Sequence, residues 1–270
     1  MRLDRPIGIL LLLWPTLIAL WLATNGKPSL HIVLIFCSGV IVMRSAGCVI
    51  NDYADYNLDS HVSRTKNRPL ASKQITPKSA LNLFIALLII AFVIALQLNL
   101  NTIVLAIIAV FLATIYPFMK RITGYPQLVL GIAFAWSVPM AYMQITGKLT
   151  LETWIVFASV VAWVIAYDTQ YAMADKSDDL KIGIKSTAIS FGNYDKFIIG
   201  SLQLLCLIGL SYVGVVKSFN YMFYLMLSLA VILIIYQQWL IKDRLPERCM
   251  AAFINNNYFG ALMFLGIVCG

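Results

Sequence analysis

The sequence predicts an all-α integral membrane protein whose helices form one bundle. Its composition is the first observation, because 61% of the 270 residues are hydrophobic and only 12% are charged. Soluble domains carry roughly a quarter charged residues. The second observation is that the chain divides into nine apolar runs of about twenty residues, the length that crosses roughly 30 Å of hydrocarbon as a helix. We therefore expect about nine transmembrane helices in a single domain covering residues 1–270.

The predicted spans follow one another with short connections. The first, Ile7–Ala23, has a basic start like a signal peptide, but it is long, contains Trp14-Pro15 and lacks a clean small-x-small cleavage site. We interpret it as a retained helix. The remaining spans are predicted at residues 31–50, 80–98, 102–119, 128–145, 153–171, 197–216, 220–241 and 253–270. Several contain Pro or Gly, which membrane helices tolerate.

Charge is distributed unevenly between the two sides of these spans. Connections on the side of the N-terminus carry sixteen Lys and Arg residues and those on the other side three, with Arg44 inside the second span. The positive-inside rule puts the N-terminus and this basic side in the cytoplasm. Of the twelve acidic residues only Glu152 lies away from this side. The pattern predicts a central cavity that opens to the cytoplasm. The net charge of +8 reflects this bias and attraction to anionic lipid, so no nucleic acid is needed to explain it.

The second span ends in a cluster of polar residues. On a helix, Asn51, Asp55 and Asp59 stack on one face at i, i+4 and i+8. Followed backward, the same face reaches Cys48 and then Arg44. One polar stripe is therefore predicted to run from inside the membrane to its surface.

The sixth span ends in a similar cluster. Asp168, Tyr171, Asp175 and Asp179 fall on one helix face at i, i+3, i+7 and i+11. Both clusters end an apolar helix on the cytoplasmic side and precede a basic loop. The two are offset by about 120 residues, which indicates a weak internal duplication, although two matched motifs do not establish a repeat.

Crowded carboxylates at two helix ends need a physical reason. Like charges at i, i+4 repel, and ionisable groups at membrane depth are costly and usually functional. Cations between them would relieve the repulsion, and oxygen ligands without His or Cys suit Mg²⁺ or Ca²⁺. Facing each other, the clusters would hold a diphosphate through bridging Mg²⁺. Ordinary polar helix ends are the alternative, which a single cluster would favour and two disfavour.

Basic residues follow the second, fourth and sixth spans on the carboxylate side. Such side chains stabilise the charge that develops on a leaving diphosphate. For any one of them, contact with lipid headgroups is the plainer explanation. The set comprises Arg64, Arg68, Lys120, Arg121, Lys181 and Lys185.

These residues resemble a known family. Asn51-Asp52-x-x-Asp55-x-x-x-Asp59 and Asp175-x-x-x-Asp179 are similar to the two aspartate-rich motifs of the UbiA superfamily of intramembrane prenyltransferases. Tyr116-Pro-Phe-Met-Lys120 resembles the Y-x-x-x-K element of that superfamily. Longer stretches resemble the bacterial branch that prenylates 4-hydroxybenzoate, at residues 2–8, 46–55, 116–121, 167–173, 181–187 and 255–258. The resemblance covers essentially the whole chain.

The resemblance implies a function, a cofactor and a site. It implies a bacterial inner-membrane enzyme of nine helices that transfers a polyprenyl group from its diphosphate to 4-hydroxybenzoate, next to the hydroxyl, in ubiquinone biosynthesis. The donor's tail would leave through a lateral opening into membrane lipid, and no obligate protein partner is inferred. The implied Mg²⁺ ligands are Asn51, Asp52, Asp55, Asp59, Asp175 and Asp179. The implied catalytic residues are Asp55, Asp59, Asp175, Asp179, Lys120 and Arg121, and the implied substrate contacts are Arg44, Asn51, Arg64, Arg68, Tyr116, Tyr171, Lys181 and Lys185.

The acceptor's carboxylate needs a cationic partner in a cavity of low dielectric, and a bidentate arginine is the usual solution. Arg121 adjoins Lys120 at the end of the fourth span, and we favour it. Arg44, inside the second span, is the second choice. The plainer alternatives are a solvated loop charge for Arg121 and a structural ion pair with Asp168 for Arg44.

Three other functions compete with this one. A secondary transporter would use Asp168 and Arg44 at mid-membrane between inverted repeats, but the carboxylates gather at one face and the apparent repeat is parallel. A soluble-type prenyl synthase also uses paired aspartate motifs, but it does not need nine spans. A related intramembrane enzyme would act on dihydroxynaphthoate, homogentisate or haem, which branch-level similarity disfavours.

Overall fold

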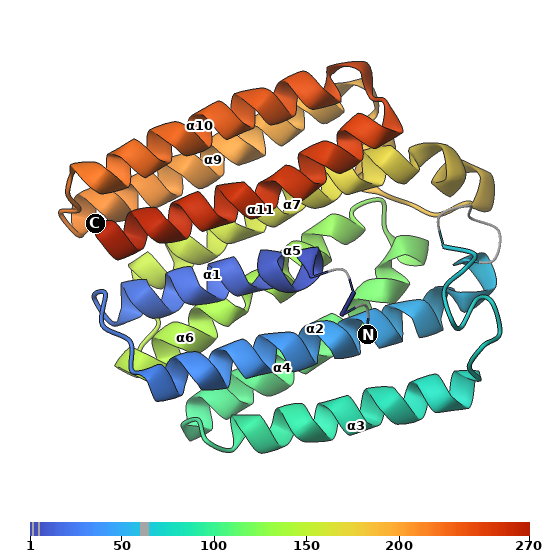
Figure 1. Ribbon diagram of the computed structural model, residues 1–270, viewed down its shortest axis with the longest axis horizontal. Helices are drawn as coiled ribbons and strands as arrows, with labels where there is room; N and C mark the ends of the chain where they lie inside the picture. The colour runs from blue at the N-terminus through green and yellow to red at the C-terminus, as the bar shows by residue number, and fades with distance from the viewer. Residues whose placement is uncertain (2, 5, 60–64) are drawn as a thin grey trace.

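The computed structural model describes the chain except for residues 2, 5 and 60–64 and the side chains of Leu58 and Asp59. Within the described residues the secondary structure is entirely helical. The helices run side by side along one axis of the molecule (Figure 1). Their bounds are α1 Ile7–Ala23, α2 Leu30–Asp59, α3 Pro77–Ala95, α4 Leu100–Ile122, α5 Pro126–Ala135, α6 Ser137–Thr146, α7 Leu151–Ile182, α8 Thr187–Ser190, η1 Gly192–Tyr194, α9 Asp195–Val216, α10 Tyr221–Leu240, η2 Ile241–Asp243 and α11 Pro246–Cys269.

The predicted membrane architecture is confirmed. In the described chain, eight segments are long and apolar enough to cross a membrane, and α1 is a shorter apolar helix of 17 residues. Together they account for the nine predicted spans. The fifth span is divided into α5 and α6, which meet at Trp136.

Local sequence signals explain where several helices begin and end. The side chains of Thr76 and Asn99 accept hydrogen bonds from backbone N–H groups in the first turns of α3 and α4. Thr150 and Thr153 form a reciprocal capping box at the start of α7. At its other end, Gly183 has a positive φ of 72°, a conformation that glycine adopts at little cost. These caps satisfy backbone groups that a helix end leaves unpaired.

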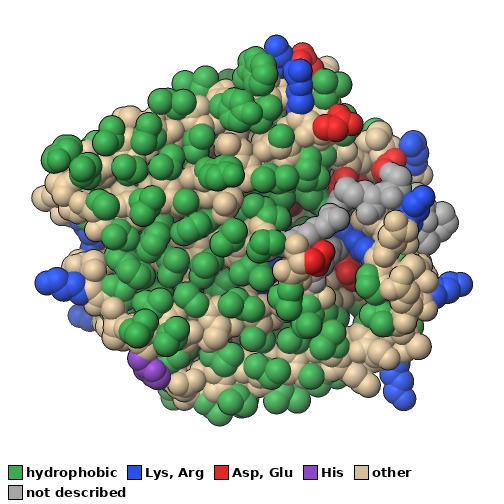
Figure 2. All heavy atoms as spheres, viewed as in Figure 1, with side chains coloured by type: hydrophobic (Ala, Val, Ile, Leu, Met, Phe, Trp, Pro, Cys, Tyr) green, Lys and Arg blue, Asp and Glu red, His purple; other side chains and the backbone are tan. Residues whose placement is uncertain are grey.

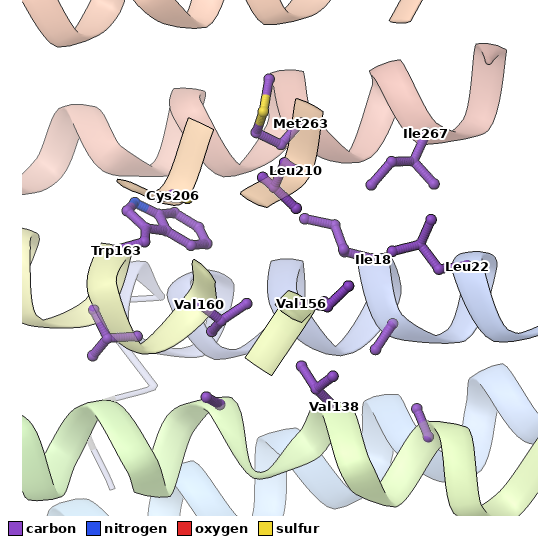
Figure 3. Packing of buried hydrophobic residues seen from close by; sticks show 14 of the residues in the cluster. Ile18, Leu22, Val138, Val156, Val160, Trp163, Cys206, Leu210, Met263 and Ile267 are labelled. Atoms are coloured by element: carbon purple, nitrogen blue, oxygen red, sulfur yellow. The ribbon is translucent and has the colours of Figure 1, made fainter. Parts of the chain in front are cut away.

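The main apolar core lies where α1, α6, α7, α9 and α11 meet. Figure 3 shows the side chains that fill it, among them Ile18, Val156 and Met263. Val156 is fully buried, and Ile18 and Met263 are nearly so. This core supports α7, the helix that carries the second carboxylate cluster.

The outer surface is apolar, as a lipid-facing surface should be. Ile89 of α3 and Phe111 of α4 are 59% and 63% exposed. In Figure 2, hydrophobic side chains cover most of the visible face, and the visible acidic side chains gather toward one end of the bundle. This arrangement matches a protein with lipid around its middle and an acidic site near one membrane surface.

Candidate active site

A large cavity runs through the bundle. Its volume is about 860 Å³, and α1, α2, α3, α4, α5, α7 and α11 all contribute to its lining. That size is within the usual range of roughly 300–1,000 Å³ for small-molecule sites. The lining is charged at one end of α2, α4 and α7 and mostly apolar elsewhere, apart from Arg44. It therefore suits a ligand with one charged end and a long apolar part.

One wall of the charged end comes from α2. Arg44, Cys48, Asn51 and Asp55 line the cavity, so the polar stripe expected from the sequence faces inward. Asp55 is buried, with 4% of its surface exposed. The fourth member of the stripe, Asp59, lies outside the described side chains.

The neighbouring helix α4 places the ammonium group of Lys120 next to the α2 wall. The Nζ of Lys120 donates hydrogen bonds to Asn51 Oδ1 at 3.3 Å and to Asp55 Oδ2 at 3.2 Å. In the described part of the chain, Asp55 Oδ1 is buried and accepts no hydrogen bond. Arg121 Nη2 lies 3.8 Å from this oxygen. One carboxylate oxygen of Asp55 is therefore paired with Lys120, and the other is available to a ligand in the cavity.

The opposite wall comes from α7. Asp168, Tyr171, Asp175 and Asp179 all line the cavity, which places the second carboxylate cluster across from the first. Gln127 of α5 also lines the cavity and accepts a hydrogen bond from the backbone N–H of Thr187 at 2.9 Å. Two clusters that are more than a hundred residues apart in sequence thus meet at one cavity.

Arg44 lies deeper in the same cavity. Its guanidinium carbon is 5.9 Å from the ring centroid of Phe134, and its Nη1 donates to Cys48 Sγ at 3.0 Å. Its Nε is buried and has no hydrogen-bond partner in the described chain. Gly8 of α1 makes room for it, because a Cβ at that position would collide with the guanidinium. Arg44 therefore offers an unused donor beside an aromatic face.

Sequence reasoning missed two residues of this deeper part. The Tyr167 hydroxyl is buried without a hydrogen-bond partner among the described residues, and Tyr167 lines the cavity. Phe134 lies under Arg44 in a span that has no charged residue to mark it. Tyr167 stands next to Asp168 in the sequence, and that adjacency was the available signal. Nothing in the sequence marked Phe134.

The remaining expected site residues are placed unevenly. Arg68 lines the cavity and pairs with Asp52 at 3.2 Å. Lys185 also lines the cavity, and its Nζ donates to the carbonyl of Ile122 at 3.2 Å. Lys181 is turned outward, with its side chain 73% exposed and paired with Asp178.

The last three expected site residues are Tyr116, Arg121 and Arg64, and one of the two described residues lines the cavity. Tyr116 lines the cavity with its ring centroid 5.7 Å from Lys120 Nζ. Arg121 donates a hydrogen bond to the carbonyl of Ala54 and is half exposed, with 49% of its side chain accessible. It is not part of the cavity lining. Arg64 lies outside the described residues.

The donor set suits a hard cation that keeps part of its water shell. Among the described side chains, no three His, Cys, Asp or Glu residues converge into a ready-made metal cluster. Mg²⁺ does not need one, because it usually takes one or two carboxylates and fills its shell with water and phosphate oxygens. Asp55, with its available Oδ1, and Asp175 and Asp179 across the cavity meet that requirement.

A helical membrane bundle around a cavity with carboxylates at one end can house an enzyme whose substrate is partly apolar. The sequence matches the UbiA prenyltransferase family over residues 12–267, and the chain belongs to that family. It is therefore a membrane-embedded prenyltransferase.

Two curated relatives are similar over nearly the whole chain. A protein of Tolumonas auensis named 4-hydroxybenzoate octaprenyltransferase is 55% identical over 99% of this chain and 93% of its own length. A protein of the same name from Escherichia fergusonii is 52% identical over 99% of this chain and 92% of its own length.

Solved structures share the fold. A UbiA homologue from Aeropyrum pernix has a TM-score of 0.85 at 23% identity, covering 99% of this chain and 98% of its own. A UbiA homologue from Archaeoglobus fulgidus, bound to GPP and Mg²⁺, has a TM-score of 0.72 at 18% identity and covers 98% of each chain.

Proposed function

We propose that this protein, as one domain over residues 1–270, transfers a polyprenyl group from polyprenyl diphosphate to the ring carbon next to the hydroxyl of 4-hydroxybenzoate. Diphosphate is released, Mg²⁺ is required, and the product is an intermediate of ubiquinone biosynthesis. The names of relatives that are 52–55% identical over 99% of the chain support this choice of acceptor. Another aromatic acceptor with the same chemistry is the second candidate.

The observation that carries the proposal is the pairing of two acidic helix ends across one cavity. Asp55 on α2 keeps a buried oxygen available, and Asp175 and Asp179 on α7 line the facing wall. Such a concentration of negative charge favours a bound cation, and a cation held on both sides favours an anionic ligand between them. A diphosphate joined to an apolar chain matches both the charged end and the apolar remainder of the cavity.

The Mg²⁺ ligands in this proposal are Asn51, Asp52, Asp55 and Asp59 on α2 and Asp175 and Asp179 on α7. Of these, Asp52 contacts Arg68 and does not line the cavity, so in this arrangement its part is to hold that arginine. When bound, Mg²⁺ would neutralise diphosphate oxygens and stabilise the charge that develops on the leaving group. The Archaeoglobus fulgidus homologue bound to GPP and Mg²⁺ supports the requirement for the metal.

The chain's own cations and apolar walls perform the other tasks. Lys120, Arg68 and Lys185 line the charged end, where their positive charge favours departure of the diphosphate. The bond between the allylic carbon and oxygen breaks, and the aromatic ring then forms a bond to that carbon and loses its ring proton. The apolar walls keep water from capturing the allylic cation before the ring does.

Between the two arginines considered for the acceptor, the geometry favours Arg44. It lines the cavity, lies against Phe134 and keeps an unpaired Nε, so a benzoate could pair with the guanidinium and pack on the ring. Arg121 instead contacts the backbone of Ala54 and approaches Asp55. That position suits the support of Asp55, or a contact with diphosphate.

We place the protein in the bacterial inner membrane with its N-terminus and charged cavity end toward the cytoplasm. The support is the excess of Lys and Arg at this end of the spans. A cytoplasmic site would also receive 4-hydroxybenzoate and release diphosphate into water.

The experiment is an assay of purified protein in lipid with a polyprenyl diphosphate, Mg²⁺ and one of three acceptors, with products identified by mass. We expect a prenylated product from 4-hydroxybenzoate and little from dihydroxynaphthoate or homogentisate. Preference for another acceptor would retain the reaction type and reject the substrate. The absence of any covalent product, combined with uptake of substrate into vesicles, would favour a transporter.

A further inference from the structure

Two cations and two aromatic rings converge at the turn between α10 and α11. The ring centroid of Trp239 is 5.3 Å from Lys242 Nζ and 5.4 Å from the guanidinium carbon of Arg248. Tyr236, which precedes Trp239 by one helical turn, stacks on it with ring centroids 6.0 Å apart and an interplanar angle of 18°. We call these four residues the Trp239 patch. None of them lines the central cavity, so the proposed transfer reaction does not account for them.

The Trp239 patch is open to its surroundings. Tyr236 and Trp239 are 46% and 50% exposed, and 41% of the Arg248 side chain is accessible. In Figure 1 the turn between α10 and α11 lies at the same end of the bundle as the C-terminal ends of α2 and α7, which places the patch near a membrane surface. Trp and Tyr concentrate at that depth in membrane proteins, where headgroups meet the hydrocarbon. The patch therefore faces lipid headgroups.

The turn that carries Lys242 is held in place by contacts with the start of α9. Arg244 pairs with the buried Asp195 through hydrogen bonds of 2.7 and 2.8 Å, and it also donates to the carbonyl of Asn193 at 3.0 Å. Lys196 Nζ donates to the carbonyl of Lys242 at 3.0 Å. These contacts fix the backbone of η2. The cations beside it need little reordering to meet a ligand, and such preorganisation strengthens binding.

The two cations of the patch are available to an anion. Among the described residues, the Lys242 ammonium contacts the Trp239 ring and has no ion-pair partner. Arg248 Nη1 pairs with Asp243 Oδ2 at 3.1 Å, but both side chains are about half exposed, and such exposed pairs are weak. A planar guanidinium holds a phosphate through two parallel hydrogen bonds, and an ammonium adds a point charge beside it. Together the two cations suit one phosphate group.

Toward the membrane interior, α10 presents an apolar strip that begins at the patch. Leu225, Leu229, Ile232 and Tyr236 recur at spacings of four, three and four residues, which puts them on one helix face with Trp239. All of them are exposed, Ile232 by 60%. From Leu229 to Trp239 the helix rises about 15 Å, which is one leaflet of a hydrocarbon core about 30 Å thick. An acyl chain beneath a headgroup at the patch would lie along this strip.

We propose that the Trp239 patch binds the headgroup of an anionic phospholipid, with the phosphate between Lys242 and Arg248 and the acyl chains along α10. The site is separate from the central cavity and does not depend on the proposed reaction. A second copy of this chain is the other occupant to consider. The large side chains of the strip disfavour it, because helices that pack together in membranes use small residues at the contact.

The test measures lipid binding to purified wild-type protein in a neutral detergent by native mass spectrometry. Phosphatidylglycerol is compared with phosphatidylethanolamine, whose own ammonium group opposes the two cations. We expect phosphatidylglycerol to bind about tenfold more tightly or better, as two cations beside an anionic headgroup predict. Equal affinity for the two lipids would overturn the proposal.

Substitutions that remove one charge locate the site. Lys242→Gln and Arg248→Gln should each weaken binding of phosphatidylglycerol about fivefold and change binding of phosphatidylethanolamine by less than about twofold. Lys148→Gln removes the same charge from an exposed lysine between α6 and α7, at the other end of the bundle, and should match wild type. Asp243→Asn should not weaken binding, because it frees Arg248 from its partner.

Three results with these variants would each overturn the proposal. They are unchanged binding of phosphatidylglycerol in both Lys242→Gln and Arg248→Gln, an equal loss in Lys148→Gln, and a fivefold loss in Asp243→Asn.

A second measurement does not depend on variants. Phosphatidylglycerol with a photoreactive diazirine near the top of one acyl chain is mixed with wild-type protein in bilayers of phosphatidylethanolamine and irradiated, and the labelled peptides are identified by mass. We expect label enriched on residues 236–248 and lowered by excess unlabelled phosphatidylglycerol. Label spread evenly over the lipid-facing helices would overturn the proposal. A stable dimer with chemical cross-links between the α10 helices of two copies would assign the surface to self-association instead.

Discussion

The two sides of the cavity are built in different ways. On the side of α7, α9, α10 and α11, the helices are joined by buried amides. Gln237 Oε1 accepts hydrogen bonds from Gln170 at 3.2 Å and Gln203 at 2.7 Å, and its Nε2 donates to Asn255 at 2.9 Å. Asn256 extends this network by donating to Gln170 at 2.8 Å. On the side of α3 and α4, apolar surfaces predominate and much of them faces outward.

The difference indicates that the two sides of the cavity hold different parts of the donor. A diphosphate held by carboxylates needs a precise arrangement of oxygens, and the amide network fixes α7, which carries Asp175 and Asp179. A flexible prenyl tail needs space and apolar contact more than exact placement. We interpret the network as the support of the charged end, and the apolar surfaces of α3 and α4 as walls suited to an apolar ligand.

The largest expected effect tests whether the two sides meet at one reaction centre. Asp55→Asn on α2 and Asp175→Asn on α7 should each lower kcat by at least about 100-fold, as loss of charge at a site that stabilises a leaving group does. Asp59→Asn and Asp179→Asn should behave alike. Steady-state rates in lipid, normalised to inserted protein, give the measurement.

Asp243→Asn is the matched control. Asp243 is half exposed, lies in η2 and pairs with Arg248 at 3.1 Å. Its rate should stay within about twofold of wild type, because exposed ion pairs contribute little. If all five variants behaved alike, the two clusters would not be a site.

The next effect concerns the amide network. Gln237→Leu removes three hydrogen bonds of a fully buried side chain. At about 0.6 kcal/mol for each such bond in a membrane protein, the free energy of unfolding should fall by about 2 kcal/mol. Denaturant unfolding in mixed micelles measures it. The control is Gln97→Leu, at an exposed position after α3, which should change stability by less than about 0.5 kcal/mol. Equal effects would mean that the network does not distinguish the two sides.

A smaller effect separates the two arginines. Arg44→Ala should raise KM for 4-hydroxybenzoate by about tenfold or more, since a desolvated charge would lose its partner, and should leave KM for the donor nearly unchanged. Arg121→Ala should change the donor's KM or kcat instead. The reverse pattern would restore Arg121 as the acceptor's partner.

The last prediction in this order concerns the orientation of the protein in the membrane and involves no change in activity. A reporter fused after Gly270 should lie on the outer face of the inner membrane, and one inserted in the loop between α2 and α3 should be cytoplasmic, because the basic residues lie on that side. A cytoplasmic C-terminus would contradict the assigned orientation.

Much of the architecture was predictable because the hydrocarbon core of a membrane allows few kinds of spanning segment, and the apolar helix is the commonest. A helix needs about twenty apolar residues to cross the membrane, so the number and order of the spans could be predicted from the sequence. Three helices are longer than predicted, because polar turns continue them beyond the apolar run: α2 ends at Asp59 rather than at Ile50, α7 ends at Ile182 rather than at Tyr171, and α11 begins at Pro246 rather than at Phe253. The stripe of Arg44, Asn51 and Asp55 could also be predicted, because helical periodicity alone puts these residues on one face. The break between α5 and α6 at Trp136 was not expected, since the run of apolar residues continues through it.

The rest depended on packing between distant segments. Gln170 and Gln237 are 67 positions apart, and no local pattern links them. Gly8 is needed only because the Arg44 side chain lies against α1. Lys181 and Lys185 look equivalent in the sequence, yet Lys185 lines the cavity and Lys181 faces solvent, because α7 ends at Ile182 before the chain turns back toward α4.

The most direct test of the central claim is binding of the donor with and without Mg²⁺. Binding of octaprenyl diphosphate to wild-type protein in lipid is compared with that to Asp55→Asn and Asp175→Asn. If α2 and α7 hold one diphosphate through Mg²⁺, wild type should bind the donor about 100-fold more tightly with Mg²⁺ than with a chelator, a coupling of about 2.7 kcal/mol, and either variant should lose most of that difference. Tight binding that is the same with chelator, or that survives both substitutions, would contradict the account.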